Sequence, residues 1–250
     1  MLITALIIFA SLVVSVVFLI VVKQATDEPA RQQANAFTGA VVAVIGTTYA
    51  VLLAFMLGGV WDMLGQAQAN DEREATALIN IYRISRQIKD PNAVQIQDIC
   101  RKYAQNVIGR EYLSLEQRGE NSPEGAQMID QLWQVMADIK VQSQNDAITI
   151  YQMMEELRNL TERRRLRAMN GREGLPGILW AVLLTGGAIT IASTCFFGVS
   201  SFRLHVAQVM ALTFLISLVL VAIADIDKPY QGPVRVQGAG FQNAIRMFGN

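Results

Sequence analysis

The sequence predicts an all-α membrane protein, with four transmembrane helices in two pairs and a helical cytoplasmic domain between the second and third helices. Hydrophobic residues make up 52% of the chain and charged residues 17%. Most of the charge lies between Asp62 and Glu173, and long uncharged stretches flank that segment. A soluble core would mix apolar and polar residues at helical or strand spacing. The separation of apolar and charged residues into different stretches of the chain therefore indicates that the protein crosses a lipid bilayer.

The apolar runs give the expected domain boundaries. We expect a first transmembrane helix pair in residues 1–61, a helical cytoplasmic domain in 62–174, a second transmembrane hairpin in 175–224 and a cytoplasmic tail in 225–250. The spans themselves are expected at residues 2–22, 37–61, 175–199 and 204–224. Each is close to the roughly 20 apolar residues that cross a hydrocarbon core of about 30 Å. No Lys or Arg precedes Lys23, which argues against a signal peptide because signal peptides begin with a basic segment.

Arginines set the expected orientation. Those just before the third span are Arg158, Arg163, Arg164, Arg165, Arg167 and Arg172. Positive charge beside a span is held in the cytoplasm. We therefore expect a protein of the cell's inner membrane whose large domain and both termini lie on the cytoplasmic side. Arg163, Arg164, Arg165, Arg167 and Arg172 are also candidates for contact with lipid head groups or anions. A solvated helix that only sets topology is the simpler interpretation.

The segment between the second and third spans has the composition of helices, rich in Ala, Gln, Glu, Arg and Leu. Helices are expected at residues 71–88, 93–115 and 126–168, the last with a break near 141–145 left open. Asn70 or Asp71 would cap the first helix. No segment alternates with a period of two, so no sheet is expected. A last helix, residues 241–248, would lie along the membrane interface or dock under the domain.

Several function classes lack their sequence signals. No P-loop, GxGxxG, HExxH or GxSxG pattern occurs, so we expect no enzyme. Cys100, Cys195 and His205 have no ligand-type neighbours, and we expect neither a metal nor another cofactor. A formal net charge of +0 gives no reason to expect a nucleic-acid partner. Glu74, Arg83, Arg86 and Glu111 are expected to form structural ion pairs inside the domain.

The second span carries the main functional signal. Small residues recur every three or four positions and form a helix-packing stripe: Gly39, Ala43, Gly46, Ala50, Ala54 and Gly58. Bulkier residues are candidates to line a pore: Ile45, Tyr49, Leu52, Phe55 and Met56. Close packing of helices would by itself explain the stripe.

Short motifs resemble a known family. Residues 46–55 (GTTYAVLLAF) look like the second-span signature of the bacterial bestrophin-like family. Residues 71–78 (DEREATAL), 82–83 (YR), 163–167 (RRRLR), Pro176, Trp180 and 227–232 (DKPYQG) are similar to its later blocks. Tyr103, 107–108 and 111–112 are similar to a Tyr–Val-Ile–Glu-Trp pattern, with Tyr112 replacing the tryptophan. The diagnostic motifs of bestrophins themselves are missing, so no pore residue is transferred.

The resemblance implies kinship with bestrophins, which are oligomeric anion channels with four spans per subunit and a pore lined by the second span. The spans contain no Asp, Glu, Lys or Arg, which is compatible with passive conduction and unlike ion-coupled transporters. The expected partners are therefore the lipid bilayer, further copies of the chain and permeant inorganic ions. The alternative is a non-conducting scaffold or sensor whose cytoplasmic domain binds a protein or lipid partner.

Overall fold

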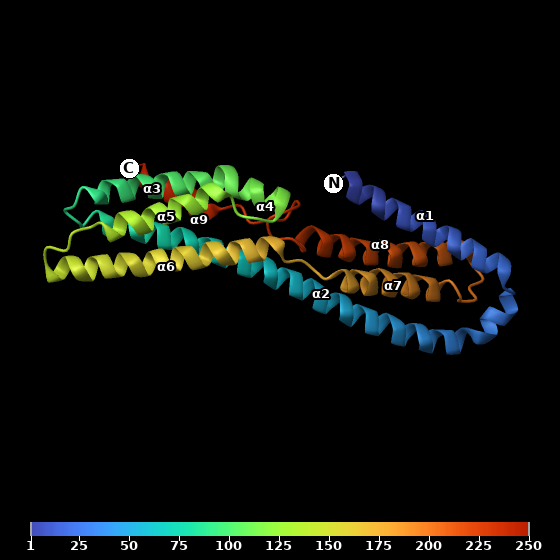
Figure 1. Ribbon diagram of the computed structural model, residues 1–250. Helices are drawn as coiled ribbons and strands as arrows, with labels where there is room; N and C mark the ends of the chain where they lie inside the picture. Colours follow the sequence, from blue (N-terminus) through green and yellow to red (C-terminus); the bar gives the residue numbers. More distant parts are fainter. Residues whose placement is uncertain (1, 250) are drawn as a thin grey trace. The chain divides into compact units, whose positions relative to one another are not determined.

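The computed structural model describes residues 2–249, and these residues form helices and no strand (Figure 1). The all-α prediction is confirmed. The chain divides into two compact units. The membrane unit comprises residues up to Trp61 together with Leu175–Asp227, and the helical unit comprises Asp62–Gly174 together with the residues from Lys228 onward.

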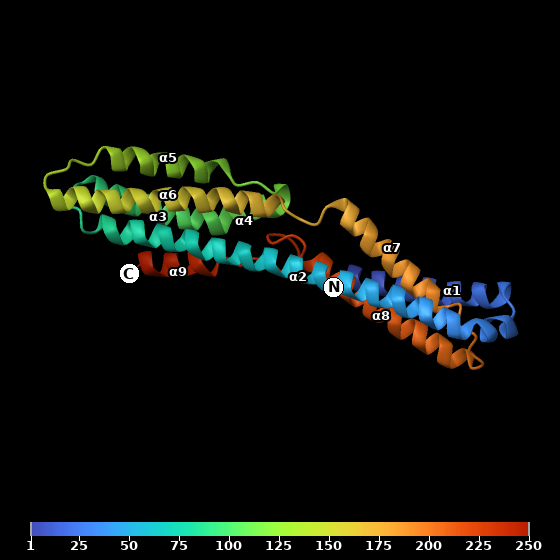
Figure 2. The ribbon, with the colours of Figure 1, turned by 90° about the horizontal axis from the view of Figure 1, so that it is seen from below.

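The membrane unit contains the helices that are long and apolar enough to cross a bilayer. They are α1 (Leu2–Ala25), the first part of α2 (Glu28–Ser85), α7 (Gly177–Thr194) and α8 (Phe202–Ile226). Helix α1 packs along α8, and α7 and α8 lie side by side (Figures 1 and 2). A small core of Leu19, Val22, Cys195 and Val209 holds these helices together. Most other side chains of the spans face outward, as lipid-facing residues would.

Helix α2 runs without interruption from Glu28 to Ser85. The predicted start of a new helix at Asn70 or Asp71 is therefore wrong. Both side chains serve tertiary contacts and do not cap a helix: Asn70 Nδ2 donates to the Arg163 carbonyl at 2.9 Å, and Asp71 Oδ1 accepts from the Tyr112 hydroxyl at 2.5 Å. No proline interrupts residues 62–85, so nothing breaks the helical hydrogen bonding there.

In the helical unit, five further elements share a hydrophobic core with the second part of α2. They are α3 (Asn92–Asn106), the π-helical turn η1 (Val107–Glu111), α4 (Tyr112–Arg118), α5 (Pro123–Ala137) and α6 (Gln144–Arg172). The predicted third helix is thus two helices. Ser122 and Ser143 cap α5 and α6, because each hydroxyl accepts the backbone N–H three residues later, at 3.3 and 3.1 Å.

The last helix, α9 (Ala239–Phe248), docks into the core of the helical unit. Of the two alternatives predicted for this segment, the structure shows docking. The Phe248 ring lies 4.4 Å from that of Tyr82, and the Phe241 ring lies 6.3 Å from that of Tyr103, measured between centroids. Arg101 Nε donates to the Phe248 carbonyl at 3.0 Å. Figure 2 shows α9 running beside the second part of α2.

Candidate functional site

Tyr49 attaches the membrane part of α2 to α7 of the same chain. Its side chain is only 5% exposed, and its hydroxyl donates to the Leu183 carbonyl of α7 at 2.9 Å. The ring lies directly on Gly186 and Gly187, where any side chain larger than hydrogen would collide with it. A hydroxyl in a bilayer needs an internal acceptor, which explains why this residue turns inward.

The other predicted pore residues differ in exposure. Ile45, Leu52 and Met56 are half-buried, whereas the side chain of Phe55 is 72% exposed. Tyr49, expected among the pore-lining residues, is instead held against α7. Phe55 is therefore the most exposed of the predicted pore residues.

The small-residue stripe is largely unused within the chain. Ala43, Ala50, Ala54 and Gly58 are exposed, while Gly39 and Gly46 are half-buried. A Cβ added at Gly46 or Gly58 would meet no atom within 4 Å. The stripe borders an apolar groove of about 350 Å³ between α2 and α8. Close packing inside this chain thus does not account for it.

Of a second exposed row on α2, only Phe55 was among the predicted pore residues. Phe37, Val44, Val51 and Phe55 are all exposed and large. They follow one another at intervals of seven, seven and four residues, so they share one side of the helix. The repeat is visible in the sequence, but nothing in the sequence alone separates this apolar row from the one that Tyr49 buries.

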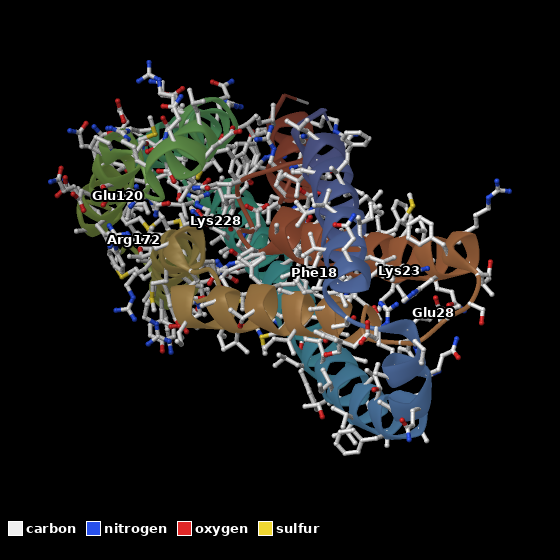
Figure 3. All side chains as sticks on the ribbon, turned by 90° about the vertical axis from the view of Figure 1, so that its right-hand side faces the viewer. Phe18, Lys23, Glu28, Glu120, Arg172 and Lys228 are labelled. Carbon is white, nitrogen blue, oxygen red and sulfur yellow. The ribbon has the colours of Figure 1, made fainter. Side chains whose placement is uncertain are left out.

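Short polar contacts fix both ends of the membrane unit. At one end, Asp227 accepts from the Leu175 N–H at 2.6 Å and from Trp180 Nε1 at 3.3 Å, which joins the start of α7 to the end of α8. At the other end, Asn35 exchanges two hydrogen bonds with the backbone of Gly198, at 2.8 and 3.0 Å. Lys23 lies near the turn into α2 (Figure 3), with its ammonium 4.9 Å from the centre of the Phe202 ring.

The helical unit encloses a cluster of ionisable side chains. Arg167 is fully buried and pairs with two fully buried carboxylates, those of Glu74 and Glu111. Its Nη1 lies 3.3 Å from Glu74 Oε1. Arg164 adds Nη2 and Nε contacts to Glu111 Oε1 at 2.8 and 3.2 Å. Buried ion pairs need such additional hydrogen bonds because desolvation of the charges is costly.

Two tyrosines complete the cluster. Tyr103 donates its hydroxyl to Glu74 Oε1 at 2.6 Å, and Tyr112 donates to Asp71 Oδ1 at 2.5 Å. Burial raises the pKa of Glu74 to about 7, although Arg167 and Tyr103 act in the opposite direction. Burial also raises the pKa of Asp71, which the Tyr112 hydrogen bond and Arg167 partly offset. The carboxyl groups of Glu74 and Asp71 are therefore harder to ionise than exposed ones.

Local backbone features place Glu111. It is the last residue of η1, and a π-helical turn shifts the side chains that follow relative to a regular α-helix. Gly125, in the first turn of α5, leaves the space that the Glu111 carboxylate occupies, since a Cβ there would collide with it and lie tightly against the Arg164 guanidinium. Ser122 Oγ donates to Glu111 Oε1 at 3.3 Å.

The predicted roles of the charged residues change accordingly. Glu74 and Glu111 do form internal ion pairs, but with Arg167 and not with Arg83 or Arg86, which are exposed. Arg167, expected among the lipid or anion contacts, is enclosed by protein. The signal for this lies in spacing: the buried residues of α6 recur at intervals of three and four, at Met153, Leu157, Leu160, Arg167 and Gly171, with nearly buried Arg164 between them.

The remaining arginines of the predicted contact group lie nearer the surface. Arg163 is half-buried and Arg165 is exposed. Arg172 pairs with Glu120 at 2.6 Å, and both side chains are more than half exposed (Figure 3). Contact of these three with lipids or anions stays a prediction. Among residues 2–249, no group of three or more His, Cys, Asp or Glu side chains is placed to hold a metal ion.

Comparison with known proteins links this fold to one family. The family profile described as "Bestrophin-like domain" matches residues 5–241. A search of the curated proteins finds no match. Crystal structures of a bacterial bestrophin homolog from Klebsiella pneumoniae have the same fold. The one phased with zinc is 12% identical, with a TM-score of 0.72 and coverage of 97% of this chain and 99% of that chain. A point variant of it is 13% identical, with a TM-score of 0.71 and coverage of 96% and 97%.

Proposed function

The chain belongs to the bestrophin-like family, and on that premise we propose that it forms a homo-oligomeric ion channel in the inner membrane, which conducts anions passively along a path lined by α2. The observation that carries this proposal is the free surface of α2. One side of the helix is attached to α7 through Tyr49, and the rest of its circumference carries the unused small-residue stripe and the exposed row ending at Phe55.

The two exposed surfaces suit different neighbours. Small residues let the backbones of two helices approach closely in lipid, so the stripe suits a helix of an adjacent subunit. Large apolar side chains such as Phe55 and Val51 then face the axis. Rings of such residues form constrictions that gate a pore by excluding water.

Passive conduction is favoured over coupled transport. The predicted spans contain no Asp, Glu, Lys or Arg, whereas proton relays and ion-coupled transporters bury such groups in the membrane. The choice of anions rests on the kinship with bestrophins. The cytoplasmic side is assigned to the helical unit and to both termini from the arginines before the third span, because positive charge near a span end is retained inside.

Ion flux from liposomes tests the proposal. The purified protein should release chloride from loaded vesicles, and Phe55→Ala should raise the rate because it widens an apolar constriction. Phe214→Ala is the matched control, since Phe214 is also an exposed aromatic residue (49%, against 72% for Phe55) but lies on α8. It should leave the flux unchanged. Tyr49→Ala and Leu52→Ala should alter the flux less than Phe55→Ala.

Two results would contradict the proposal. If the vesicles retain both chloride and cations, with wild-type and variant protein alike, the protein is not a channel. A flux that responds to Phe214→Ala and not to Phe55→Ala would move the path away from α2. Equal release of chloride and potassium would keep the channel but exclude anion selectivity.

The non-conducting scaffold has one observation in its favour. Val141, Ile148 and Tyr151 are exposed apolar residues at the start of α6 and just before it, and they suit a protein partner. Under this alternative, vesicles containing any of the variants stay tight.

A further inference from the structure

The buried cluster of the helical unit carries more negative than positive charge. Its carboxylates are Asp71, Glu74 and Glu111, each at most 1% exposed. The guanidinium groups that pair with them are those of Arg164 and Arg167. Three acids against two bases leave one excess negative charge when all are ionised. An uncompensated buried charge is costly, and the usual resolution is that one group changes its protonation state.

Unpartnered polar atoms indicate which group that is. Glu111 is satisfied on both oxygens, by Arg164 and Arg167. Asp71 accepts from Tyr112. Glu74 accepts from Tyr103 on Oε1, whereas its Oε2 is buried and has no hydrogen-bond partner. Of the three carboxyl groups, only that of Glu74 thus has a buried oxygen without a hydrogen-bond partner; Nε and Nη1 of Arg167 are also buried without one, and Nη1 lies 3.3 Å from the other oxygen, Oε1.

A neutral Glu74 would satisfy a second unpartnered atom. Asn70 Oδ1 is buried without a donor, and Asn70 precedes Glu74 by four residues on α2, the spacing at which side chains on a helix meet. Asn70 cannot solve this by flipping its amide, because its Nδ2 already donates to the Arg163 carbonyl. By this spacing, a proton on Glu74 Oε2 would supply a donor for Asn70 Oδ1, whereas a carboxylate would supply none.

We propose that Glu74 is a proton-binding site inside the helical unit, and that it takes up one proton from water as the pH falls. The proton rests on Oε2 and is donated to Asn70 Oδ1, while Oε1 keeps the Tyr103 hydrogen bond. This inference goes beyond conduction, since proton uptake holds whether or not the protein passes ions. Burial accounts for the raised pKa of Glu74, about 7, in agreement with this geometry.

Every element packed around Glu74 contributes charged or titratable groups. They are Asp71 from α2, Tyr103 from α3, Glu111 from η1, Tyr112 from α4, Arg164 and Arg167 from α6, and Tyr230 from the tail. The Tyr230 hydroxyl is buried without a partner, and the Arg167 guanidinium lies 5.8 Å from the centre of the Phe241 ring. The tail therefore forms part of the wall around the proton site, and its docking should depend on the charge there.

Infrared difference spectroscopy of the full-length protein in detergent tests the site directly. A protonated carboxylic acid has a carbonyl stretch that a carboxylate lacks. We expect this band to appear in the wild type as the pH falls from 8 to 6, with one buried group titrating near pH 7. The band should be lost in Glu74→Gln and retained in Glu120→Gln, a control at an exposed ion pair.

Thermal melting gives a second readout. Glutamine mimics the neutral acid, so Glu74→Gln should melt at the same temperature as the wild type at pH 5 and higher at pH 8, by about 3 °C or more. The sign follows from linkage: the folded state binds the proton more tightly, so the wild type loses stability as the pH rises from about 4.5 to about 7. Glu111→Gln should instead melt lower at both pH values.

The proposal fails if the wild type shows no acid band between pH 8 and 6, which requires no variant to fold. It also fails if the band survives in Glu74→Gln, because another group then holds the proton. A Glu74→Gln variant that melts below the wild type at pH 8 would show that the ionised form stabilises the fold. None of these results depends on ion flux, so they leave the channel proposal to its own test.

Discussion

Arg167→Met measures how far the helical unit depends on its buried cluster. The substitution keeps much of the side-chain volume but removes the guanidinium that pairs with Glu74 and Glu111. At pH 8, where the proposal above leaves Glu74 ionised, the carboxylates of Glu74 and Glu111 would then remain buried beside Asp71, with Arg164 as the one guanidinium in the cluster. Removing one member of a buried ion pair typically costs about 3–5 kcal/mol. For a chain of this size we expect Tm to fall by about 6–20 °C.

Arg172→Met on the same helix is the matched control. Arg172 pairs with Glu120 at a shorter distance, 2.6 Å against 3.3 Å for Arg167 Nη1 and Glu74. Both members of this pair are solvated, however, because 64% of the Arg172 side chain and 58% of the Glu120 side chain are exposed. Such surface pairs contribute about 0–1 kcal/mol, so Tm should fall by no more than about 4 °C.

Differential scanning fluorimetry on the tryptophans of the purified protein gives both Tm values. Equal values for the two variants would refute the reasoning, because burial would then make no difference to an ion pair. Adding Glu111→Gln to Arg167→Met should recover part of the loss, since it removes one of the stranded charges. A double variant less stable than Arg167→Met would contradict that explanation.

Three further outcomes are expected. Tyr49→Phe removes the hydroxyl that bonds to the α7 backbone and should cost about 0.6–1.7 kcal/mol, seen as a lower Tm; an unchanged Tm would mean that α2 is held otherwise. Asp227→Ala leaves the Leu175 N–H and Trp180 Nε1 without an acceptor and should cost about 1–3 kcal/mol; a more stable variant would contradict this. Burial raises the pKa of the Cys100 thiol, so in a Cys195→Ser background Ellman's reagent should react only after unfolding, even at pH 9. Reaction of the folded protein would show that α3 opens readily.

The membrane spans could be predicted from the sequence because a bilayer requires long uncharged helices, whatever the tertiary structure. The course of α2 could not. Asn70 and Asp71 are good N-cap residues, yet both are consumed by contacts to Arg163 and Tyr112, which come more than thirty residues later in the chain. A local signal cannot show that a distant segment will use the same polar groups.

The arginines before the third span show the same limit. Composition placed them in one basic group, and the positive-inside rule treats them as equivalent. In the structure their neighbours on α6 separate them: Arg167 continues the buried row of Leu157 and Leu160, whereas Arg165 points to solvent. Helical spacing in the sequence indicates which of these arginines is buried. That Arg167 pairs with Glu74 and Glu111, however, depends on how α2 and η1 pack, which the sequence does not show.

Tyr49 illustrates why pore residues are hard to assign from one sequence. Its size and position fit a constriction, but its hydroxyl must find an acceptor away from lipid, and the Leu183 carbonyl provides one. Phe55 has no such constraint and remains exposed.

The most direct test is an image of the purified oligomer viewed along its symmetry axis. We predict a ring of α2 helices nearest the axis, with Phe55 facing a continuous path and the Gly46–Gly58 stripe against the adjacent subunit. A particle whose axis is lined by α1 or α8, or in which the α2 surfaces face lipid with no path between them, would contradict the account.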